Sequence, residues 1–278
     1  MATGPPRERA VTPTLPALAL DALVLFAMIL ARYFLIAGGC FLLIYGSWSG
    51  QKPRFGAGET PPSAQRMRRD IRLSVQSAVV FAVGAALLVA AIRMGITLVY
   101  PDPARYGWWY LALSYGAVLV IQDAYFYFTH RLFHHQRLFR WFHAAHHQSR
   151  QPTPWTSFAF DTVEAAVQAL FLLGIVFVLP LHMVTLMAVL GTMSIWAVIN
   201  HLGLDRLPGS FPHGWLGRWF IGPAHHSLHH EKYGVHFGLY FTFWDRLLGT
   251  EDPDYAELYG PGSGVAVRPR GSPGGTVA

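Results

Sequence analysis

The stretch DAYFYFTHRLFH, residues 123–134, covers the end of an apolar segment and contains a pair of histidines. His130 and His134 are four residues apart, so on a helix they project from adjacent turns of one face. Tyr127 and Asp123 lie on the same stripe, one and two turns earlier. The stretch therefore predicts the last turns of a helix that presents two imidazoles side by side.

Two further histidine clusters repeat one spacing, HxxHH, as HAAHH at residues 143–147 and HSLHH at residues 226–230. On a helix, the first histidine of each cluster shares a face with both of the later ones. His201, which follows Asn200, stands between the two clusters. Imidazoles from adjacent turns can bind one metal ion while a neighbouring imidazole reaches a second, so the pattern favours a site for two metal ions.

The type of ligand narrows the choice of metal. Imidazole suits iron, zinc, copper and nickel, whereas magnesium and calcium prefer oxygen ligands. Carboxylates are almost absent beside the clusters, so a magnesium or calcium site is not expected. Glu164 is expected to be only a charge near the N-terminus of a helix. Asp123 is a candidate acceptor that fixes a histidine tautomer, and Tyr127 and Asn200 are further candidates for contacts around the ligands.

Composition predicts a membrane protein. Hydrophobic residues make up 53% of the 278 residues and charged residues 13%, whereas a soluble domain carries about 25% charged residues. The net charge of +6 suits nucleic acid or the anionic cytoplasmic leaflet of a membrane. The long apolar runs favour the leaflet, so no nucleic-acid partner is expected. The single cysteine, Cys40, excludes a disulfide within the chain.

The apolar runs predict the fold class. The apolar runs that we expect to span the membrane as helices cover residues 17–45, 73–99, 108–128, 163–179 and 183–199. The last two runs are expected to form a helical hairpin. We therefore expect an all-α integral membrane protein with about four to five transmembrane helices and a cytoplasmic, histidine-rich helical cap. The expected parts are a disordered arm over residues 1–16, an N-terminal transmembrane region over residues 17–107, a histidine-bearing domain over residues 108–259 and a disordered tail over residues 260–278.

Basic residues predict the orientation of the helices. Residues 46–72 contain several lysine and arginine side chains, which the positive-inside rule places in the cytoplasm. Following the spans from there puts residues 129–160 and the chain from residue 201 onward on the same side. Among the histidines that follow, only His182 then lies on the opposite side. Because the positive-inside rule does not use histidine, the convergence of the clusters on one side independently supports both predictions.

Histidines outside the clusters are judged by their position. His135 and His225 lie next to cluster residues, and His236 follows the last cluster closely, so all three are possible ligands. His182 lies in the expected turn of the hairpin, and His213 lies between a proline and a glycine. These last two are expected to be ordinary polar residues.

Together these features resemble the fatty acid hydroxylase/sterol desaturase superfamily. They are residues 123–134, both HxxHH clusters, the Asn200-His201 pair and the sequence WDRLLGT at residues 244–250, so the resemblance covers about residues 110–251. It implies an integral membrane enzyme with a non-haem di-iron centre on the cytoplasmic face. It implies further that O2, and electrons from a separate ferredoxin, cytochrome or reductase, are used to hydroxylate or desaturate a C–H bond of a sterol-like or fatty acyl membrane lipid.

The resemblance also implies a set of ligands for the two iron ions. Carried over residue by residue, they would be His130, His134, His143, His146, His147, His201, His226, His229 and His230. One departure is visible, because His236-Phe237-Gly238 stands where the family often has Asn-Tyr-Gly. His236 is therefore expected as a possible additional ligand of metal or water.

A zinc-dependent membrane hydrolase is the main alternative. Catalytic zinc is usually accompanied by a glutamate base, as in HExxH, but Glu231 follows His230 outside the motif and no cluster contains a glutamate. A metal transporter or store would need histidines and acids within the spans or in a low-complexity loop, and the spans are nearly free of both. An oxygenase is therefore favoured, with both hydroxylation and desaturation open.

Overall fold

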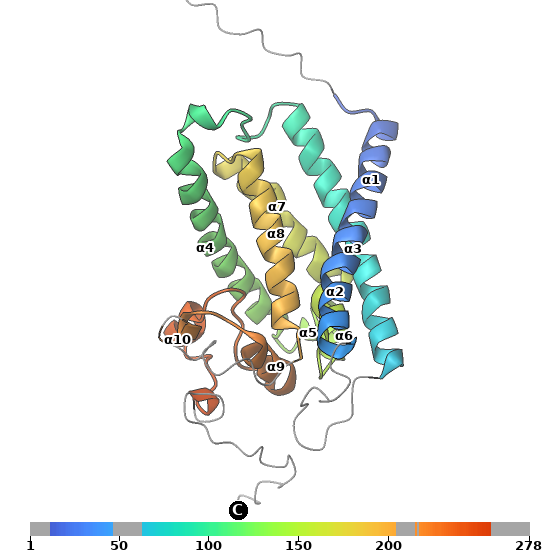
Figure 1. Cartoon of the computed structure of the whole chain (residues 1–278), viewed down its shortest axis with the longest axis vertical. Coiled ribbons are helices and arrows are strands. Elements are labelled where there is room, and N and C mark those ends of the chain that lie inside the picture. Colours follow the sequence, from blue (N-terminus) through green and yellow to red (C-terminus); the bar gives the residue numbers. More distant parts are fainter. Residues whose placement is uncertain (1–11, 47–62, 204–214, 216, 257–278) are drawn as a thin grey trace, which may run out of the picture.

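The computed structural model describes residues 12–46, 63–203, 215 and 217–256, and over these residues the fold is built of helices without a named strand (Figure 1). The elements are α1 (Leu15–Tyr33), η1 (Phe34–Gly38), α2 (Gly39–Phe41), η2 (Leu42–Gly46), α3 (Ala64–Arg93), η3 (Pro103–Arg105), α4 (Trp108–Phe133), α5 (Phe139–Phe142), α6 (Ala144–His147), η4 (Pro154–Phe158), α7 (Thr162–Val178), α8 (Met183–Asn200), η5 (Gly217–Trp219), α9 (Pro223–Lys232) and α10 (Phe243–Leu247). Most of the expected arm, the expected tail and His213 lie outside the described residues.

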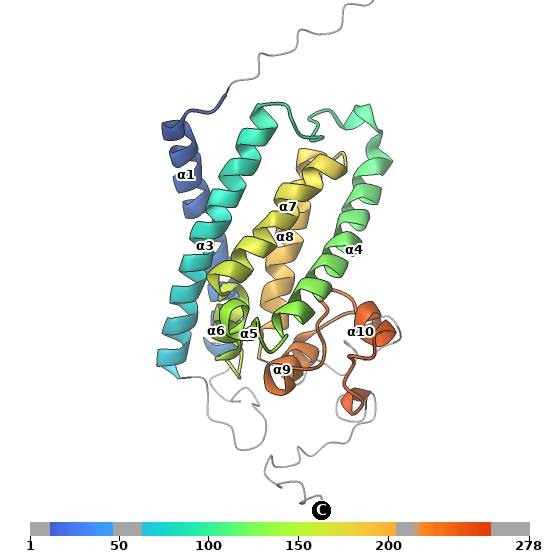
Figure 2. The same ribbon diagram turned by 180° about the vertical axis from the view of Figure 1, so that it is seen from behind.

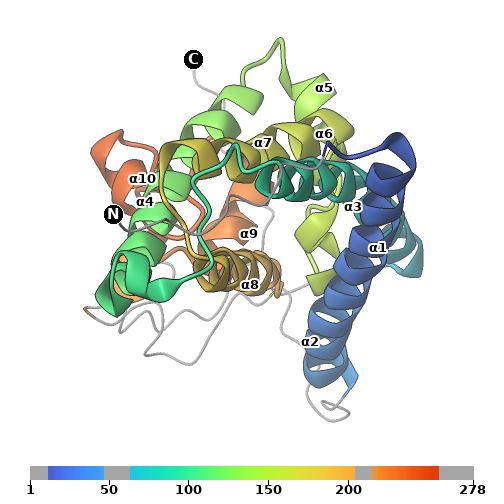
Figure 3. The ribbon, with the colours of Figure 1, turned by 90° about the horizontal axis from the view of Figure 1, so that it is seen from above.

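The long helices lie side by side, and the short helices α5, α6, α9 and α10 gather at one end of the bundle (Figures 1 and 2). Seen from above, α7 and α8 lie between α3 and α4, and α1 lies at the periphery next to α3 (Figure 3). The segments that hold the histidine clusters therefore meet at the same end of the molecule.

Four helical segments are long and apolar enough to cross a membrane, and they are Leu15–Ile44, Ala64–Arg93, Trp108–Phe133 and Met183–Asn200. α7 is a shorter apolar helix of 17 residues. Large apolar side chains remain exposed on these helices, for example Leu20, Val83 and Val120 at 62%, 50% and 57%. Exposed apolar faces of this extent suit contact with lipid. The expected all-α membrane fold is confirmed, with four spanning candidates and the shorter α7.

The boundaries of α3 differ from the prediction. The helix begins at Ala64, inside the segment expected to be a loop, and ends at Arg93 instead of residue 99. Ser63 caps its first turn by accepting a backbone N–H. Because arginine is a good helix former, the polarity of this segment did not mark the start of the helix. At the other end, Gly95 adopts a φ of +67°, a left-handed conformation that terminates the helix.

Small residues allow the membrane helices to approach each other closely. A Cβ atom at Gly84 of α3 would lie 3.2 Å from the Cβ of Ala169 on α7. α3 also packs against α1, because Ala78 and Ala82 of α3 share a buried cluster with Tyr33 of α1. A second buried cluster joins α4, α7 and α8 through Val118, Phe171, Ile175, Val176, Leu181, Leu186 and Val189. These contacts align the C-terminal ends of α4 and α8 beside α9 (Figure 1).

The expected hairpin is present as α7 and α8, whose connecting turn lies at the end of the bundle away from α9 (Figure 2). His182 occupies this turn and precedes α8. Its Nδ1 atom accepts the N–H of Val184 at 3.1 Å, and its Nε2 atom lies 2.8 Å from the carbonyl of Pro101. His182 thus caps a helix and holds a neighbouring loop, far from the clustered histidines.

Candidate metal centre

Nine histidines converge where α4, α6, α8 and α9 meet, and they form two groups. Within each group, one nitrogen atom of every histidine lies within 4.8 Å of the corresponding atoms of the others. The first group consists of His130, His134, His143, His147 and His229. The second group consists of His146, His201, His226 and His230. The two groups together contain the same nine residues that the family resemblance implied.

Each HxxHH cluster contributes to both groups. Residues 143–147 give two histidines to the first group and His146 to the second. Residues 226–230 give His229 to the first group and two histidines to the second. Because neighbouring residues of one short segment enter different groups, the two groups lie directly beside each other.

Nε2 atoms approach one another closely in the first group. The Nε2 atom of His147 lies 3.1 Å from the Nε2 atoms of both His134 and His229. The Nε2 atoms of His130 and His143 are 3.0 Å apart. Imidazole nitrogens that each lie about 2.1 Å from one transition-metal ion are separated from their neighbours by about 3 Å.

The second group has the same spacing. The Nε2 atom of His226 lies 3.0 Å from the Nε2 atoms of both His201 and His230, and the Nε2 atoms of His201 and His146 are 3.4 Å apart. Both groups therefore have the donor atoms and the separations that suit a transition-metal ion.

Hydrogen bonds on the outer nitrogen atoms fix how these rings are oriented. A carbonyl oxygen only accepts, so an Nδ1 atom bonded to one carries the proton and the Nε2 atom presents its lone pair inward. The distances from Nδ1 to the carbonyl oxygen are 3.0 Å for His130 and Phe237, 3.1 Å for His146 and Ala159, 2.6 Å for His201 and Ala197, and 2.7 Å for His229 and Val235. Lone pairs that converge in this way are suited to bind a cation.

Burial keeps these rings uncharged. It is the main cause that lowers the pKa well below the ordinary value of histidine, and the neighbouring histidines lower the pKa further, in His143, His146, His147, His226, His229 and His230. Neutral imidazole is the form that binds metal ions, so the local environment favours ligation.

Glu164 is a residue of the site that the sequence did not reveal. It was expected to be only a helix-terminal charge, but its side chain is fully buried and its Oε2 atom lies 2.7 Å from Nδ1 of His143. The expectation that Glu164 is only a helix-terminal charge was therefore wrong. The interpretation failed because Glu164 is 17 residues from the nearest cluster residue in sequence, His147, and only the packing of α7 brings it near.

Asp123, Tyr127 and Asn200 make hydrogen bonds to chain segments around the groups. Oδ1 of Asp123 accepts N–H groups of residues 239–241 at 2.7 to 3.2 Å, so Asp123 anchors this segment instead of bonding a histidine. Nδ2 of Asn200 donates to the carbonyl of Leu239 at 3.1 Å, and the hydroxyl of Tyr127 lies 2.8 Å from that of Thr250.

The WDRLLGT sequence contributes a second anchor. Asp245, which is fully buried, accepts the N–H groups of Phe237 and Gly238 at 2.8 and 3.0 Å and the hydroxyl of Thr250 at 2.7 Å. A Cβ atom at Gly238 would lie 2.5 Å from the carbonyl oxygen of Phe241, so only glycine fits there. The anchored turn places the Phe237 carbonyl against His130.

The three single histidines that were possible ligands lie outside both groups. His236 is buried with a φ of +55°, and its Nε2 atom accepts the N–H of Asp252 at 3.3 Å. Its ring makes a T-shaped contact with the ring of His225. The Nδ1 atom of His225 lies 3.1 Å from the hydroxyl of Tyr255. His135 is exposed. The expectation of an additional ligand at His236 is therefore not met by the arrangement of the described residues.

A cavity of about 30 Å³ adjoins both groups. It lies among residues of α4, α7 and α8, and histidines of both groups form part of its wall. Its apolar wall consists of Phe126, Phe160, Ala197 and Leu239, with Glu164, Asn200 and Ser157 as polar neighbours. The cavity therefore lies between the two histidine groups and apolar side chains of the helices.

Comparison with known proteins identifies the family of this chain. The family model described as Fatty acid hydroxylase matches residues 115–250. A Delta(7)-sterol 5(6)-desaturase of Gibberella zeae is 34% identical over 164 residues, which are 59% of this chain and 49% of that relative. The lathosterol oxidase of Rattus norvegicus is 31% identical over 237 residues, 84% of this chain and 75% of that relative. The human lathosterol oxidase is 32% identical over 200 residues, 70% of this chain and 65% of that relative.

The chain thus spans about half the length of the fungal relative and about three quarters of the rat one. No solved structure matches it. The matched region contains all nine grouped histidines, Asp123 and the WDRLLGT sequence. The chain belongs to the fatty acid hydroxylase/sterol desaturase superfamily.

Proposed function

We propose that this protein uses O2 to oxidise C–H bonds of a sterol or a sterol-like membrane lipid at a pair of iron ions. The observation that carries the proposal is the pair of adjacent histidine groups with inward lone pairs, beside a cavity among apolar helices. Relatives named as sterol desaturases and lathosterol oxidases favour a sterol over a fatty acyl chain, and desaturation over hydroxylation. They give no support to a zinc-dependent hydrolase.

In this proposal, each histidine group holds one iron ion. When bound, the ions would supply the activation of O2 and the removal of hydrogen from an unactivated carbon. Conversion of two C–H bonds into a C=C bond, with reduction of O2 to two molecules of water, takes up two electrons and two protons. We propose that a separate protein, such as a ferredoxin, a cytochrome or a reductase, delivers the electrons.

The chain itself would orient the substrate and exclude water. Phe126, Phe160 and Leu239 form an apolar wall beside the histidines, which suits a carbon framework that arrives from the bilayer. Glu164 keeps the proton of His143 on its outer nitrogen, so the inner nitrogen stays free for the metal. These residues act through position and hydrogen bonding.

We also propose that the metal centre faces the cytoplasm. The N-terminal end of α3 lies at the end of the bundle that holds α6 and α9 (Figure 2). Arg66, Arg68 and Arg72, near this end of the helix, are exposed. Arginine near the end of a membrane helix favours the cytoplasmic side. A cytoplasmic site would be accessible to a soluble or membrane-bound electron donor.

The proposal is tested with the full chain in lipid nanodiscs, supplied with O2, a ferredoxin and its reductase. A Δ7-sterol and a saturated fatty acyl lipid serve as alternative substrates, and mass spectrometry detects a product two hydrogens lighter or one oxygen heavier. We expect loss of two hydrogens from the sterol, and no product with His229→Ala. Oxidation of the acyl lipid alone would contradict the sterol assignment, and equal activity of His229→Ala would contradict the site.

A further inference from the structure

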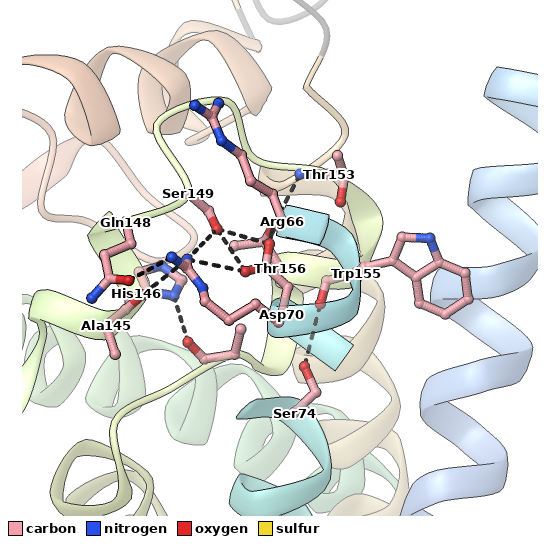
Figure 4. Close-up of polar contacts among 12 residues, drawn as sticks. Arg66, Asp70, Ser74, Ala145, His146, Gln148, Ser149, Thr153, Trp155 and Thr156 are labelled. Carbon is pink, nitrogen blue, oxygen red and sulfur yellow. Dashed lines mark hydrogen bonds and ion pairs between the residues drawn. The ribbon is translucent and has the colours of Figure 1, made fainter. Parts of the chain in front are cut away.

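Arg69 and Asp70 of α3 make hydrogen bonds to residues 145–156, which include the end of the first HxxHH cluster and the residues after it. The carboxylate of Asp70 is buried, at 2% exposure, and accepts the hydroxyl of Ser149 at 2.7 and 2.8 Å and that of Thr156 at 2.8 Å. Figure 4 shows Asp70 turned toward both hydroxyls from α3. A buried carboxylate is costly unless it is fully hydrogen-bonded, so this contact ties α3 firmly to residues 149 and 156.

Arg69, the neighbour of Asp70, reaches the same segment. Its guanidinium donates to the side chain of Gln148 at 2.5 Å, to the hydroxyl of Ser149 at 3.0 Å and to the carbonyl of Ala145 at 3.4 Å. It also pairs with Asp70 at 3.3 Å. Ala145 and Gln148 are the residues immediately before and after His146 and His147 in the sequence. The hydrogen bonds of Arg69 therefore hold the chain on both sides of these two histidines.

The segment that Arg69 and Asp70 contact has little secondary structure of its own to hold its side chains. α6 contains only 4 residues, and a helix of one turn is not stable alone. His143 lies before α6 with a φ of −149°, so the cluster is not one continuous helix. His147 belongs to the first group and His146 to the second. Their positions therefore depend on contacts made from outside the segment.

We propose that Arg69 and Asp70 are positioning residues that set the geometry of both histidine groups from the N-terminal part of the chain. The pair lies outside residues 115–250, where the family model matches. This inference rests on the part of the proposed function that the two groups bind metal ions, and not on the identity of the lipid. Residues that orient metal ligands typically change metal affinity by about 10- to 100-fold when they are removed.

Ser74→Ala provides a matched control on the same helix. Ser74 is also buried and donates to the carbonyl of Trp155 at 3.2 Å, in the same connection between α6 and α7. That carbonyl also accepts the hydroxyl of Tyr33 at 2.8 Å, so it keeps a partner when Ser74 is replaced. In Figure 4, the contact between Ser74 and Trp155 lies apart from the ring of His146.

The test is a titration of the metal-free, full-length protein in nanodiscs with Co²⁺, whose visible spectrum reports the coordination number. We expect Asp70→Ala to bind Co²⁺ about 10- to 100-fold more weakly than the wild type and Ser74→Ala. Excess Co²⁺ should restore the wild-type spectrum in Asp70→Ala, because all ligands remain. His146→Ala should not be restored, because a ligand is missing. If Asp70→Ala does not fold, Asp70→Asn and Arg69→Gln are titrated in the same way.

Affinity and spectrum equal to wild type in any folded Asp70 or Arg69 variant would overturn the proposal. So would equal weakening in Ser74→Ala, since that would indicate a general effect on the fold. The proposed function can fail separately. If the wild type binds two Co²⁺ ions but does not oxidise a sterol, only the proposed reaction is contradicted. If the wild type binds no Co²⁺, both the proposed function and the role of Arg69 and Asp70 are contradicted.

Discussion

At the scale of single residues, the metal centre depends on what each histidine does with its outer nitrogen. Backbone carbonyls accept from Nδ1 of His130, His146, His201 and His229, and Oε2 of Glu164 lies 2.7 Å from Nδ1 of His143. The acceptors are fixed in the backbone or buried, so the rings are oriented before any ion binds. Preorganisation of this kind makes metal affinity sensitive to the partners of the ligands as well as to the ligands.

Replacement of Glu164 tests this dependence. Glu164→Ala leaves the Nδ1 proton of His143 buried without its acceptor, so we expect the free energy of unfolding to fall by about 1–3 kcal/mol. The affinity for metal should fall by about 10- to 100-fold. The amide oxygen of Glu164→Gln still accepts, so its affinity should stay closer to wild type. The exposed Glu231, next to His230, provides the control Glu231→Ala. Equal metal affinity in all three variants would contradict the assigned role.

At the scale of elements, the histidine spacing predicted which residues come together better than it predicted the local structure that holds them. Residues 226–230 lie within α9, a helix of 10 residues, as HxxHH predicts. Residues 143–147 have the same spacing, but His143 precedes the one-turn α6 and joins its group through a bend. The spacing could not distinguish these cases, because Ala145 is held by Arg69 and Asp161, and Ser149 by Asp70, all from outside the cluster.

Gly238 tests the anchored turn that supports His130. In Gly238→Ala the new Cβ would lie 2.5 Å from the Phe241 carbonyl, and we expect the free energy of unfolding to fall by about 1–3 kcal/mol. The metal content should fall too, because the neighbouring Phe237 carbonyl orients His130. Gly234→Ala is the control, since its Cβ would meet only the Lys232 carbonyl, at 3.9 Å. Thermal unfolding and metal analysis of both variants measure the effect, and indistinguishable results would refute the argument.

At the scale of the whole molecule, the apolar runs predicted which parts of the chain form the bundle, and their order placed the histidine clusters at one end. Hydrophobicity sufficed because each spanning helix must satisfy its own backbone in lipid. It did not predict how nine histidines divide into two groups, or that Glu164 joins them. Both depend on packing between helices that are distant in sequence, such as α7 against α3 through Gly84.

The orientation in the membrane is testable with single cysteines in a Cys40→Ser background. Ala64 and Ala104 are both exposed and lie at opposite ends of α3 and its following loop. If the metal centre faces the cytoplasm, a membrane-impermeant maleimide should label Ala104→Cys in intact cells. Ala64→Cys should be labelled only after permeabilisation. The reverse pattern would place the histidine groups on the outer side.

The most direct test of the central claim is the metal content of the full chain, made in iron-sufficient cells and measured by elemental analysis. The two histidine groups predict about two iron ions per chain. His229→Ala removes a ligand of the first group and His146→Ala a ligand of the second, so each should lose about one ion or more. A wild-type chain that holds a single ion, that holds zinc alone, or that keeps its full iron content in both variants would contradict the account.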